Sequence, residues 1–462
     1  MEGVCGRWAA VLGLALLFFC SRCFSASNDW PQYRENPFVI ALRTPPDDSG
    51  LGGVVVADVN NDGLLDYLVT KPGSVGAYDH FGKVLWLKKT DVRLAAPAES
   101  KGLPGWHGPG ICAGDVDGDG RTEVLFLTGD GKVHICDGAT GEEERALRPW
   151  EPEEIEHWQH LVVANFRGRG DRDLLLQACQ KAPGYKMGRY LAAFAIENLD
   201  GKPLWYTDSY LGCAHNGARV ADIDGDGKDE VLGGTIFDED GSRTKMVYPK
   251  FRGHFDSIYV YDVRPDVPGL EVVLLEEGSN CVACVTKDEV LWRTDFKRQE
   301  PQNAAIGNFD PERPGLEIWC RSRYNEHQKP WTFDARGKVI STYNMDDVAP
   351  KGWTVRGVEV ICAIDWEGGE KQLAAAKERH RSGDICIFDP ITGRFIKRWK
   401  EHADRIYIAD VSGDWREEII VLNGSELHIY HNDAPNPNPP RPRQWTKNHY
   451  RRSKMTWNYY SP

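Results

Sequence analysis

The chain has 462 residues, 41% of them hydrophobic and 27% charged, and a formal net charge of −13 at pH 7. A chain of this length can bury an ample core without disulfide support. Its acidity argues against nucleic acid or an anionic membrane surface as the main partner, and we expect a monomer.

An apolar run near the N-terminus has the features of a secretory signal peptide. Residues 8–20 follow Arg7 and precede small residues at Ser25 and Ala26. The run is shorter than the roughly 20 apolar residues that span a bilayer. We therefore expect residues 1–26 to be removed and residues 27–462 to form one secreted domain.

A cassette of strand, acidic loop and strand occurs eight times along the chain. It starts at "DVNNDGLLDYLV" and recurs 40 to 57 residues apart. Most copies are followed by two short strands around a glycine turn, as in "AYDHFGKVLWL". Four strands per repeat predict an all-β fold, a β-propeller. The cassettes begin at Asp58, Asp115, Asn165, Asp222, Asp262, Asn308, Asp365 and Asp410.

We expect eight blades, or seven if the weak copy at Asp365 is not a blade. The main helical candidate is "EKQLAAAKERH" at 370–380. Residues 434–462 read as a Pro-rich connector followed by an aromatic tail that packs on the propeller. Cys281 and Cys284 form C-x-x-C, but "NCVACVT" predicts a strand whose positions i and i+3 face opposite sides. Structural thiols or a non-local disulfide are therefore favoured over a zinc site.

The acidic loops carry oxygen ligands at alternate positions of a Gly-rich turn, the pattern that a hard cation such as Ca²⁺ prefers. The alternative is a solvated acidic turn. In the copy at Asn165, Arg167 and Arg169 stand where acids are expected, so a guanidinium should replace the ion. We expect these ions to pin loops and take no part in catalysis. The predicted ligands are Asp115, Asp117, Asp119, Glu123, Asp222, Asp224, Asp226 and Glu230, then Asp58, Asp62, Asp66, Asp410, Asp414 and Glu418.

Five of the eight cassettes carry a histidine seven or eight residues before their first residue, where random placement predicts about 0.45. This distance is the length of the strand that enters the loop. If the acidic loops lie at one end of the propeller, the histidines ring the mouth of the central channel at the other. For a single histidine a structural role is the simpler reading; a ring favours an active site. The five are His107, His157, His215, His254 and His402.

Aromatic and basic residues accompany these histidines. Rings that stack on sugars and cations that hold a carboxylate suit an anionic carbohydrate. No G-x-S-x-G, Walker A or H-E-x-x-H motif is present. The predicted substrate-binding residues are therefore His107, His157, His402, Trp106, Trp158, His160, Asn216 and Arg252.

Several motifs resemble those of the family eleven rhamnogalacturonan lyases, in the family's order. They are "GCAHNGARVADIDGDGKDEV", "RGHFDSIYVYDVRPDVPGLEVV", "GDWREEIIV" and the ending "HYRRSKMTWNYYSP". The resemblance implies a secreted calcium-binding propeller that cleaves a uronate-containing polysaccharide by β-elimination. The propeller ulvan lyases look similar, so rhamnogalacturonan, ulvan and rhamnose-glucuronate polymers all remain candidate substrates.

β-Elimination would require three roles. A cation neutralises the uronate carboxylate, a base removes the C5 proton, and an acid protonates the leaving oxygen. Arg219, Arg252 or a bound Ca²⁺ could supply the charge. The candidates for base and acid are His215 and His254, followed by Tyr248 and Tyr190.

Two other functions fit parts of the sequence. A non-catalytic carbohydrate-binding or adhesion propeller with integrin-like (FG-GAP) repeats would share the acidic loops but would not need the histidines. A quinoprotein dehydrogenase would fit "DWPQYRENP", yet such enzymes carry adjacent cysteines over the quinone and this chain has no Cys-Cys pair.

Overall fold

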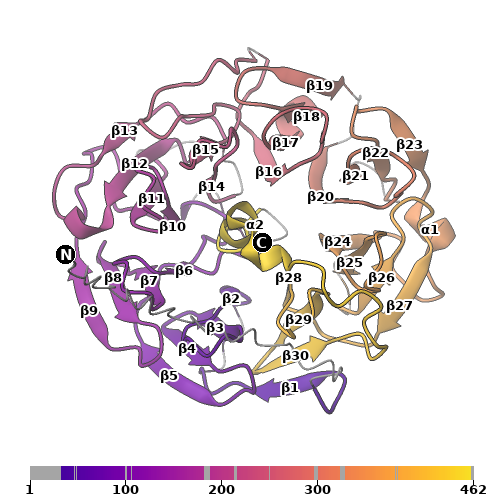
Figure 1. Cartoon of the computed structure of the whole chain (residues 1–462), viewed down its shortest axis with the longest axis horizontal. Helices are drawn as coiled ribbons and strands as arrows, with labels where there is room; N and C mark the ends of the chain where they lie inside the picture. Colours follow the sequence, from indigo (N-terminus) through magenta and orange to yellow (C-terminus); the bar gives the residue numbers. More distant parts are fainter. Residues whose placement is uncertain are drawn as a thin grey trace, which may run out of the picture.

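The computed structural model describes residues 33–458, except 46, 48, 99–100, 106, 182–187, 213–215, 249, 296–299, 323–327, 380 and 382. The predicted signal peptide lies outside the described residues. The described strands form seven four-stranded antiparallel sheets and one two-stranded sheet, arranged around a central axis (Figure 1). In each sheet the strand that comes first in the chain is innermost, except that β28 is innermost in the sheet that also contains β1. Strand β28 contacts β2, which closes the ring.

The four-stranded sheets before the two-stranded one, innermost strand first, are β2 (Gly53–Ala57), β3 (Asp66–Lys71), β4 (Ser74–Tyr78) and β5 (Val84–Lys89); β6 (Ile111–Gly114), β7 (Glu123–Leu127), β8 (Val133–Asp137) and β9 (Glu143–Leu147); and β10 (His160–Ala164), β11 (Asp173–Ala178), β12 (Tyr190–Ala195) and β13 (Trp205–Thr207). The two-stranded sheet is β14 (Arg219–Ala221) and β15 (Glu230–Leu232).

The remaining sheets are β16 (Phe255–Tyr261), β17 (Glu271–Glu276), β18 (Cys281–Val285) and β19 (Val290–Asp295); β20 (Pro301–Gly307), β21 (Glu317–Ser322), β22 (Trp331–Phe333) and β23 (Val339–Thr342); β24 (Val358–Ile364), β25 (Leu373–Glu378), β26 (Ile385–Phe388) and β27 (Phe395–Trp399); and β28 (Arg405–Ala409), β29 (Glu418–Asn423), β30 (Glu426–Tyr430) and β1 (Phe38–Ala41). The short helices are α1 (Met345–Val348), α2 (Asn448–Ser453), η2 (Ile196–Asn198), η3 (Glu277–Ser279) and η4 (Gln444–Thr446). No described helix is long and apolar enough to cross a membrane.

The predicted all-β propeller is confirmed, with the seven-bladed alternative matching the seven four-stranded sheets. The repeat at Asp365, expected to be the weak one, forms the complete sheet β24–β27. The reduced unit is instead the repeat at Asp222, where β15 continues only through isolated bridges at Phe237. Gly233 and Gly234 follow β15 and are packed closely against aromatic rings. An added Cβ would lie 2.6 Å from Tyr210 at Gly233 and 2.5 Å from Phe255 at Gly234.

The helix predicted at 370–380 is wrong, because Leu373–Glu378 is strand β25. Ala374 and Ala376 are buried in the cluster toward the preceding blade, whereas Ala375 is buried toward the following one. Small side chains are needed on both faces of a strand between two packed blades. That packing outweighs the helix propensity of alanine. The strand predicted around Cys281 and Cys284 is present as β18, with the two thiols in different clusters.

Indole rings join neighbouring blades at their outer edges. Trp86, Trp205 and Trp292 lie on the outermost strands of three blades, and each donates its Nε1–H to a backbone carbonyl in the glycine turn of the next unit at 2.7–2.9 Å. At Gly337 an added Cβ would lie 2.6 Å from the Trp292 ring, and φ is +80°. The glycine is required twice, for its conformation and for the space that the indole occupies.

Gly337→Ala should lower the free energy of unfolding by about 2–4 kcal/mol, because backbone strain and overpacking both contribute. Gly73→Ala is the matched control, since Gly73 has φ +78° but no atom within 4 Å of an added Cβ. This variant should lose about 1 kcal/mol of the free energy of unfolding. Urea unfolding of the two variants measures the difference, and equal losses would refute the indole contact as a source of stability.

The C-terminal tail returns to the central channel. Asn438 accepts a hydrogen bond from Trp415 Nε1, and α2 then lies near the axis of the ring (Figure 1). Helix α2 contacts the innermost strands β10, β14 and β16. Beyond it, Trp457 Nε1 donates to Pro104 O at 3.0 Å and Gly217 N donates to Trp457 O at 3.0 Å. The tail therefore connects the two ends of the channel.

Candidate functional site

The innermost strands define two faces of the propeller. We call the end where they begin the histidine face and the end where they turn back the acidic-loop face. His254 directly precedes β16, and His157 and His402 lie three residues before β10 and β28. The loop that starts at Asp115 follows β6, whose Gly114 pairs with Glu123. The described predicted histidines and the acidic loops thus lie at opposite ends of the strands.

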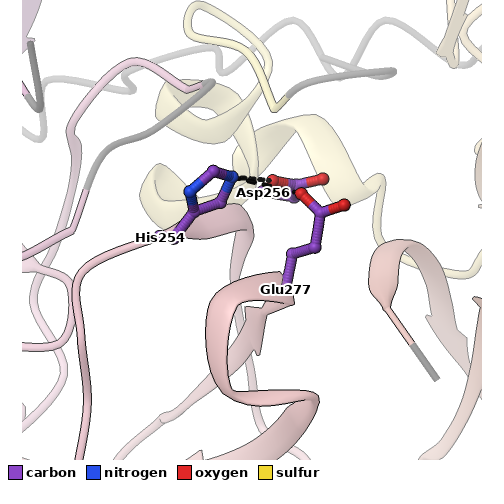
Figure 2. Close-up of side chains that lie close together, drawn as sticks. All are labelled: His254, Asp256 and Glu277. Carbon is purple, nitrogen blue, oxygen red and sulfur yellow. Dashed lines mark ion pairs between the residues drawn. The ribbon is translucent and has the colours of Figure 1, made fainter. Parts of the chain in front are cut away.

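One of these histidines belongs to a compact cluster with two acids (Figure 2). His254 Nε2 lies 3.1 Å from Glu277 Oε2 and 3.6 Å from Asp256 Oδ1. The His254 side chain is 28% exposed, Glu277 is 14% exposed and Asp256 is fully buried. We call these three residues the His254 cluster; solvent reaches it through the imidazole and Glu277.

Local backbone geometry brings the three side chains together. His254 and Asp256 are two residues apart, and a bulge between Phe255 and Ser257 redirects the strand at Asp256. Glu277 comes from η3, which follows β17 at the same face. Gly278 permits the approach, because an added Cβ there would lie 3.0 Å from the Cβ of His254.

The His254 cluster has the composition of a cation site. One ligand atom from each residue lies within 4.8 Å of the other two. A buried carboxylate such as Asp256 needs a cationic neighbour, and either a protonated imidazole or a metal ion can provide one. A ring nitrogen with two carboxylate oxygens is a donor set that a divalent cation accepts.

Burial separates His107 and His160 from this role. His160 is buried, with Nε2 3.0 Å from Thr456 Oγ1 and the ring edge-on to Trp457 at 4.6 Å. Burial lowers the pKa of His160 to about 3. Burial also lowers the pKa of His107 well below its usual range, with Arg405 and Lys377 adding to the effect. Burial thus favours the neutral form of both rings, and His160 contacts the tail through Thr456 and Trp457. The predicted substrate contacts of His107 and His160 stay predictions.

His157 and His402 remain accessible but lie apart from the cluster. His157 is half-buried, with Nδ1 3.1 Å from Glu151 Oε1. His402 is exposed on the loop before β28, in another blade. Their predicted substrate contacts stay predictions.

Three further residues that the sequence predicted for the site are buried inside the propeller. Trp158 is fully buried and donates Nε1–H to Trp150 O at 2.9 Å. Asn216 is fully buried and donates from Nδ2 to Phe255 O at 3.1 Å. Arg219 is 2% exposed and donates from Nη1 to Ser453 O of α2 at 3.0 Å. The expected contact of Arg219 with a substrate carboxylate on the histidine face is therefore not supported.

The predicted aromatic and basic residues that precede His254 in the chain differ in burial and contacts. Tyr248 is half-buried, stacked under the Arg293 guanidinium at 4.6 Å and 4.7 Å from the Phe251 ring. Arg252 is exposed, and its backbone N–H donates to Glu276. Tyr190 is buried in β12, which raises its pKa. His215 and Trp106 lie outside the described residues.

Two acidic loops bring carboxylates together as predicted from their spacing. Ligand atoms of Asp115, Asp117 and Glu123 lie within 4.8 Å of one another, as do those of Asp222, Asp224 and Glu230. In both loops the first aspartate accepts hydrogen bonds from two glycine N–H groups, which shapes the turn. Asp119 and Asp226 lie outside these groups; Asp119 pairs with Arg121 at 2.6 Å.

The other two predicted loops use their acids differently. Asp66 accepts hydrogen bonds from the N–H groups of Val59, Asn60 and His80, while Asp58 bonds to Asp62 N and Gly63 N. In the last loop, Arg443 Nε lies 2.6 Å from Asp410 and Arg416 Nη2 lies 2.7 Å from Asp414. Glu418 accepts from two backbone N–H groups. Guanidinium groups thus neutralise acids of the 410–418 loop. In the copy at Asn165, Arg167 Nε likewise lies 2.6 Å from Asp173 Oδ1.

Sequence reasoning missed Asp256 and Glu277. Asp256 had a usable signal, because it alternates with His254 along an extended segment. Glu277 had none, since it is one of two adjacent acids in "EEGSN" and only the β16–β17 pairing brings it to His254.

The sequence of this chain is similar to those of rhamnogalacturonan lyases. The model of "Rhamnogalacturonan lyase family 11, C-terminal domain" matches residues 182–459, more than half of the chain. The rhamnogalacturonan exolyase YesX of Bacillus subtilis (strain 168) is 26% identical over 416 residues, covering 77% of this chain. The rhamnogalacturonan endolyase YesW of the same organism is 25% identical over 452 residues, covering 82%. The chain spans 64% and 67% of the lengths of these two relatives.

Solved structures with distant sequences share the architecture. The computationally designed Ika8 protein matches with a TM-score of 0.51 at 11% identity, over 86% of this chain and 100% of that one. A europium-containing methanol dehydrogenase matches with a TM-score of 0.52 at 10% identity, over 85% of each chain. At such identities the likeness concerns the fold alone.

Proposed function

The chain belongs to rhamnogalacturonan lyase family 11, and from this premise we propose that it is a secreted polysaccharide lyase that cleaves a rhamnogalacturonan-type polymer by β-elimination. The observation that carries the proposal is the convergence of His254, Asp256 and Glu277 on the histidine face. Two lyases are similar to most of this chain. The non-catalytic binding module is not favoured, because the comparisons offer no support for it.

The charges of the His254 cluster require a cation for this chemistry. Asp256 and Glu277 would repel a uronate carboxylate, and one imidazole cannot offset both acids and the substrate. We propose that His254, Asp256 and Glu277 hold a divalent cation. When bound, the ion would neutralise the substrate carboxylate and make the neighbouring C5 proton more acidic.

The remaining chemistry falls to side chains around the cluster. In β-elimination a base takes the C5 proton, a C4–C5 double bond forms, and the C4–oxygen bond breaks as an acid protonates the leaving oxygen. Because His254 is engaged with two carboxylates, it suits a ligand role better than that of a base. His215, which lies outside the described residues, is the proposed base from its place in the sequence; the following residue, Asn216, donates from Nδ2 to Phe255 O. Tyr248, exposed in part beside Phe251, is the candidate acid.

An ultraviolet assay tests the reaction directly. Each β-elimination creates one unsaturated uronate, so absorbance should rise on rhamnogalacturonan in the presence of divalent cations. Ulvan and an unrelated uronic polymer serve as substrate controls, and a faster rise on ulvan would reassign the substrate. No absorbance change on any polymer, combined with retention on a rhamnogalacturonan column, would replace the lyase by the binding module.

We also propose that the loops 115–123 and 222–230 bind Ca²⁺, which three converging carboxylates in each loop support. Removal of the ions with a chelator should lower Tm by about 5 °C, and Ca²⁺ but not Mg²⁺ should restore it. Asp115→Asn combined with Asp222→Asn should remove most of the chelator effect, and any remainder belongs to the ion proposed at the His254 cluster. An unchanged effect in this double variant would exclude the two loops as the source.

A further inference from the structure

A cavity of about 350 Å³ lies in the central channel, apart from the His254 cluster. It is bounded by α2 and by the innermost strands β16, β20 and β24, from which Tyr259, Tyr261 and Cys362 line it. Asp262 and Asn308, the first residues of two loops on the acidic-loop face, line its outer part. The described lining residues include no member of the His254 cluster, so the cavity belongs to the opposite half of the channel.

A buried arginine forms part of the cavity wall. Arg219 is 2% exposed, and its guanidinium makes one hydrogen bond with the described residues, from Nη1 to Ser453 O at 3.0 Å. Its Nε and Nη2 atoms have no hydrogen-bond partner among the described residues. None of the ion pairs in the described part of the chain includes Arg219 either. A guanidinium that is buried without a carboxylate is costly unless an anion accompanies it.

The neighbours of Arg219 do not balance its charge. The groups that act on it most strongly are neutral, led by Tyr259 and Tyr261, and burial lowers its pKa to about 10. Glu417 also lines the cavity, but its carboxylate accepts from Asp365 N at 2.9 Å and from the Tyr450 hydroxyl. It is thus occupied by donors of the protein.

The rest of the lining is also net positive. Arg441, Lys447 and Lys454 join Arg219, against Asp262 and Glu417 as the acids. Lys454 Nζ lies over the Tyr450 ring at 5.0 Å, and Lys447 is exposed at the outer end. His449 adds no positive charge at neutral pH, because burial lowers its pKa to about 4. A positive, partly aromatic cavity favours an anionic ligand with an apolar or sugar-like body.

We propose that this cavity binds a small organic anion, bearing a carboxylate or a phosphate and of about monosaccharide size, with its charged group against Arg219. The ligand site is separate from the proposed lyase site and does not depend on it. Occupation would join α2, through Ser453 and Lys454, to strands β14 and β16. The anion would therefore stabilise the tail in the channel.

Thermal unfolding and titration calorimetry test the site with three probes. Glucuronate supplies a carboxylate, glucose 1-phosphate a phosphate, and glucose neither. At least one of the two anions should raise Tm by about 2 °C or more at saturation, and glucose should not. The anion that binds identifies the class; if neither binds, the proposal is wrong. Glu277→Gln must retain the effect, which separates this site from the lyase site.

Arg219→Met assigns the binding to the cavity. The variant should weaken binding of the anion at least about tenfold, and without ligand its Tm should equal or exceed that of the parent because an uncompensated buried charge is gone. Arg405→Met is the matched control, since Arg405 is also a buried first residue of an innermost strand but does not line the cavity. It should retain the anion-dependent shift. Lys454→Gln, at the cavity surface, provides a second variant, and unchanged affinity in both Arg219→Met and Lys454→Gln would overturn the assignment.

Discussion

Glu277→Gln is expected to lower kcat/KM on rhamnogalacturonan by at least about 100-fold, because glutamine keeps the shape of the side chain but loses the charge that holds a cation. Glu277 Oε2 lies 3.1 Å from His254 Nε2 in a cluster whose third member, Asp256, is fully buried. If Glu277 acts as a ligand, raising the divalent cation concentration should recover part of the lost activity. Initial rates at several cation concentrations measure both effects.

Glu426→Gln is the matched control for this result. Glu426 also pairs with a histidine, with its Oε2 3.0 Å from His428 Nε2, but it is 51% exposed on β30 in another blade. Its replacement should leave kcat/KM within about twofold of the parent. Equal activity of the two variants would show that the His254 cluster has no part in the reaction.

Arg452→Met is expected to lower the free energy of unfolding by about 3–5 kcal/mol, since it leaves a buried carboxylate without its cation. Arg452 is 3% exposed; its Nη1 pairs with Asp229, which is 1% exposed, and its Nη2 lies 2.9 Å from Asp171 Oδ1. These contacts tie the tail to the loops after β10 and β14. Urea unfolding, followed by tryptophan fluorescence, measures the loss.

Arg451→Met separates burial from simple charge removal. Arg451 precedes Arg452 and lies 2.9 Å from Asp171 Oδ2, but its side chain is 28% exposed. Solvent screens this pair, so its loss should cost about 1 kcal/mol or less. Adding Asp229→Asn to Arg452→Met should recover part of the stability, because the unpaired charge is removed. Equal losses in Arg451→Met and Arg452→Met would contradict the proposed role of the buried pair.

The repeat pattern predicted the fold well because it is local. Strand, loop and glycine turn lie within one cassette, and each blade contacts mainly its neighbours. The errors occurred where packing between blades decides the outcome. Ala374–Ala376 form a strand because only small side chains fit between two sheets, and the repeat at Asp222 is reduced although its loop is the most regular.

The site was predicted less completely than the fold. The spacing of His254 before its cassette placed it on the correct face, opposite the acidic loops. The same spacing could not distinguish His254 from His107, which is buried and held neutral by its surroundings. Nor could it show that Arg219 lies beneath the tail, because the partner in that contact, Ser453, is 234 residues away along the chain.

The amino-acid sequence alone determined the propeller, the two faces and the converging loops at Asp115 and Asp222, since each depends on the period of a strand or the spacing within one turn. Only the tertiary structure decided that Glu277 completes the His254 cluster and that the tail enters the channel and contacts Arg219. The physical reason is that strand pairing and side-chain burial bring together residues that are far apart in the chain. A local sequence pattern does not show which of these residues will be in contact.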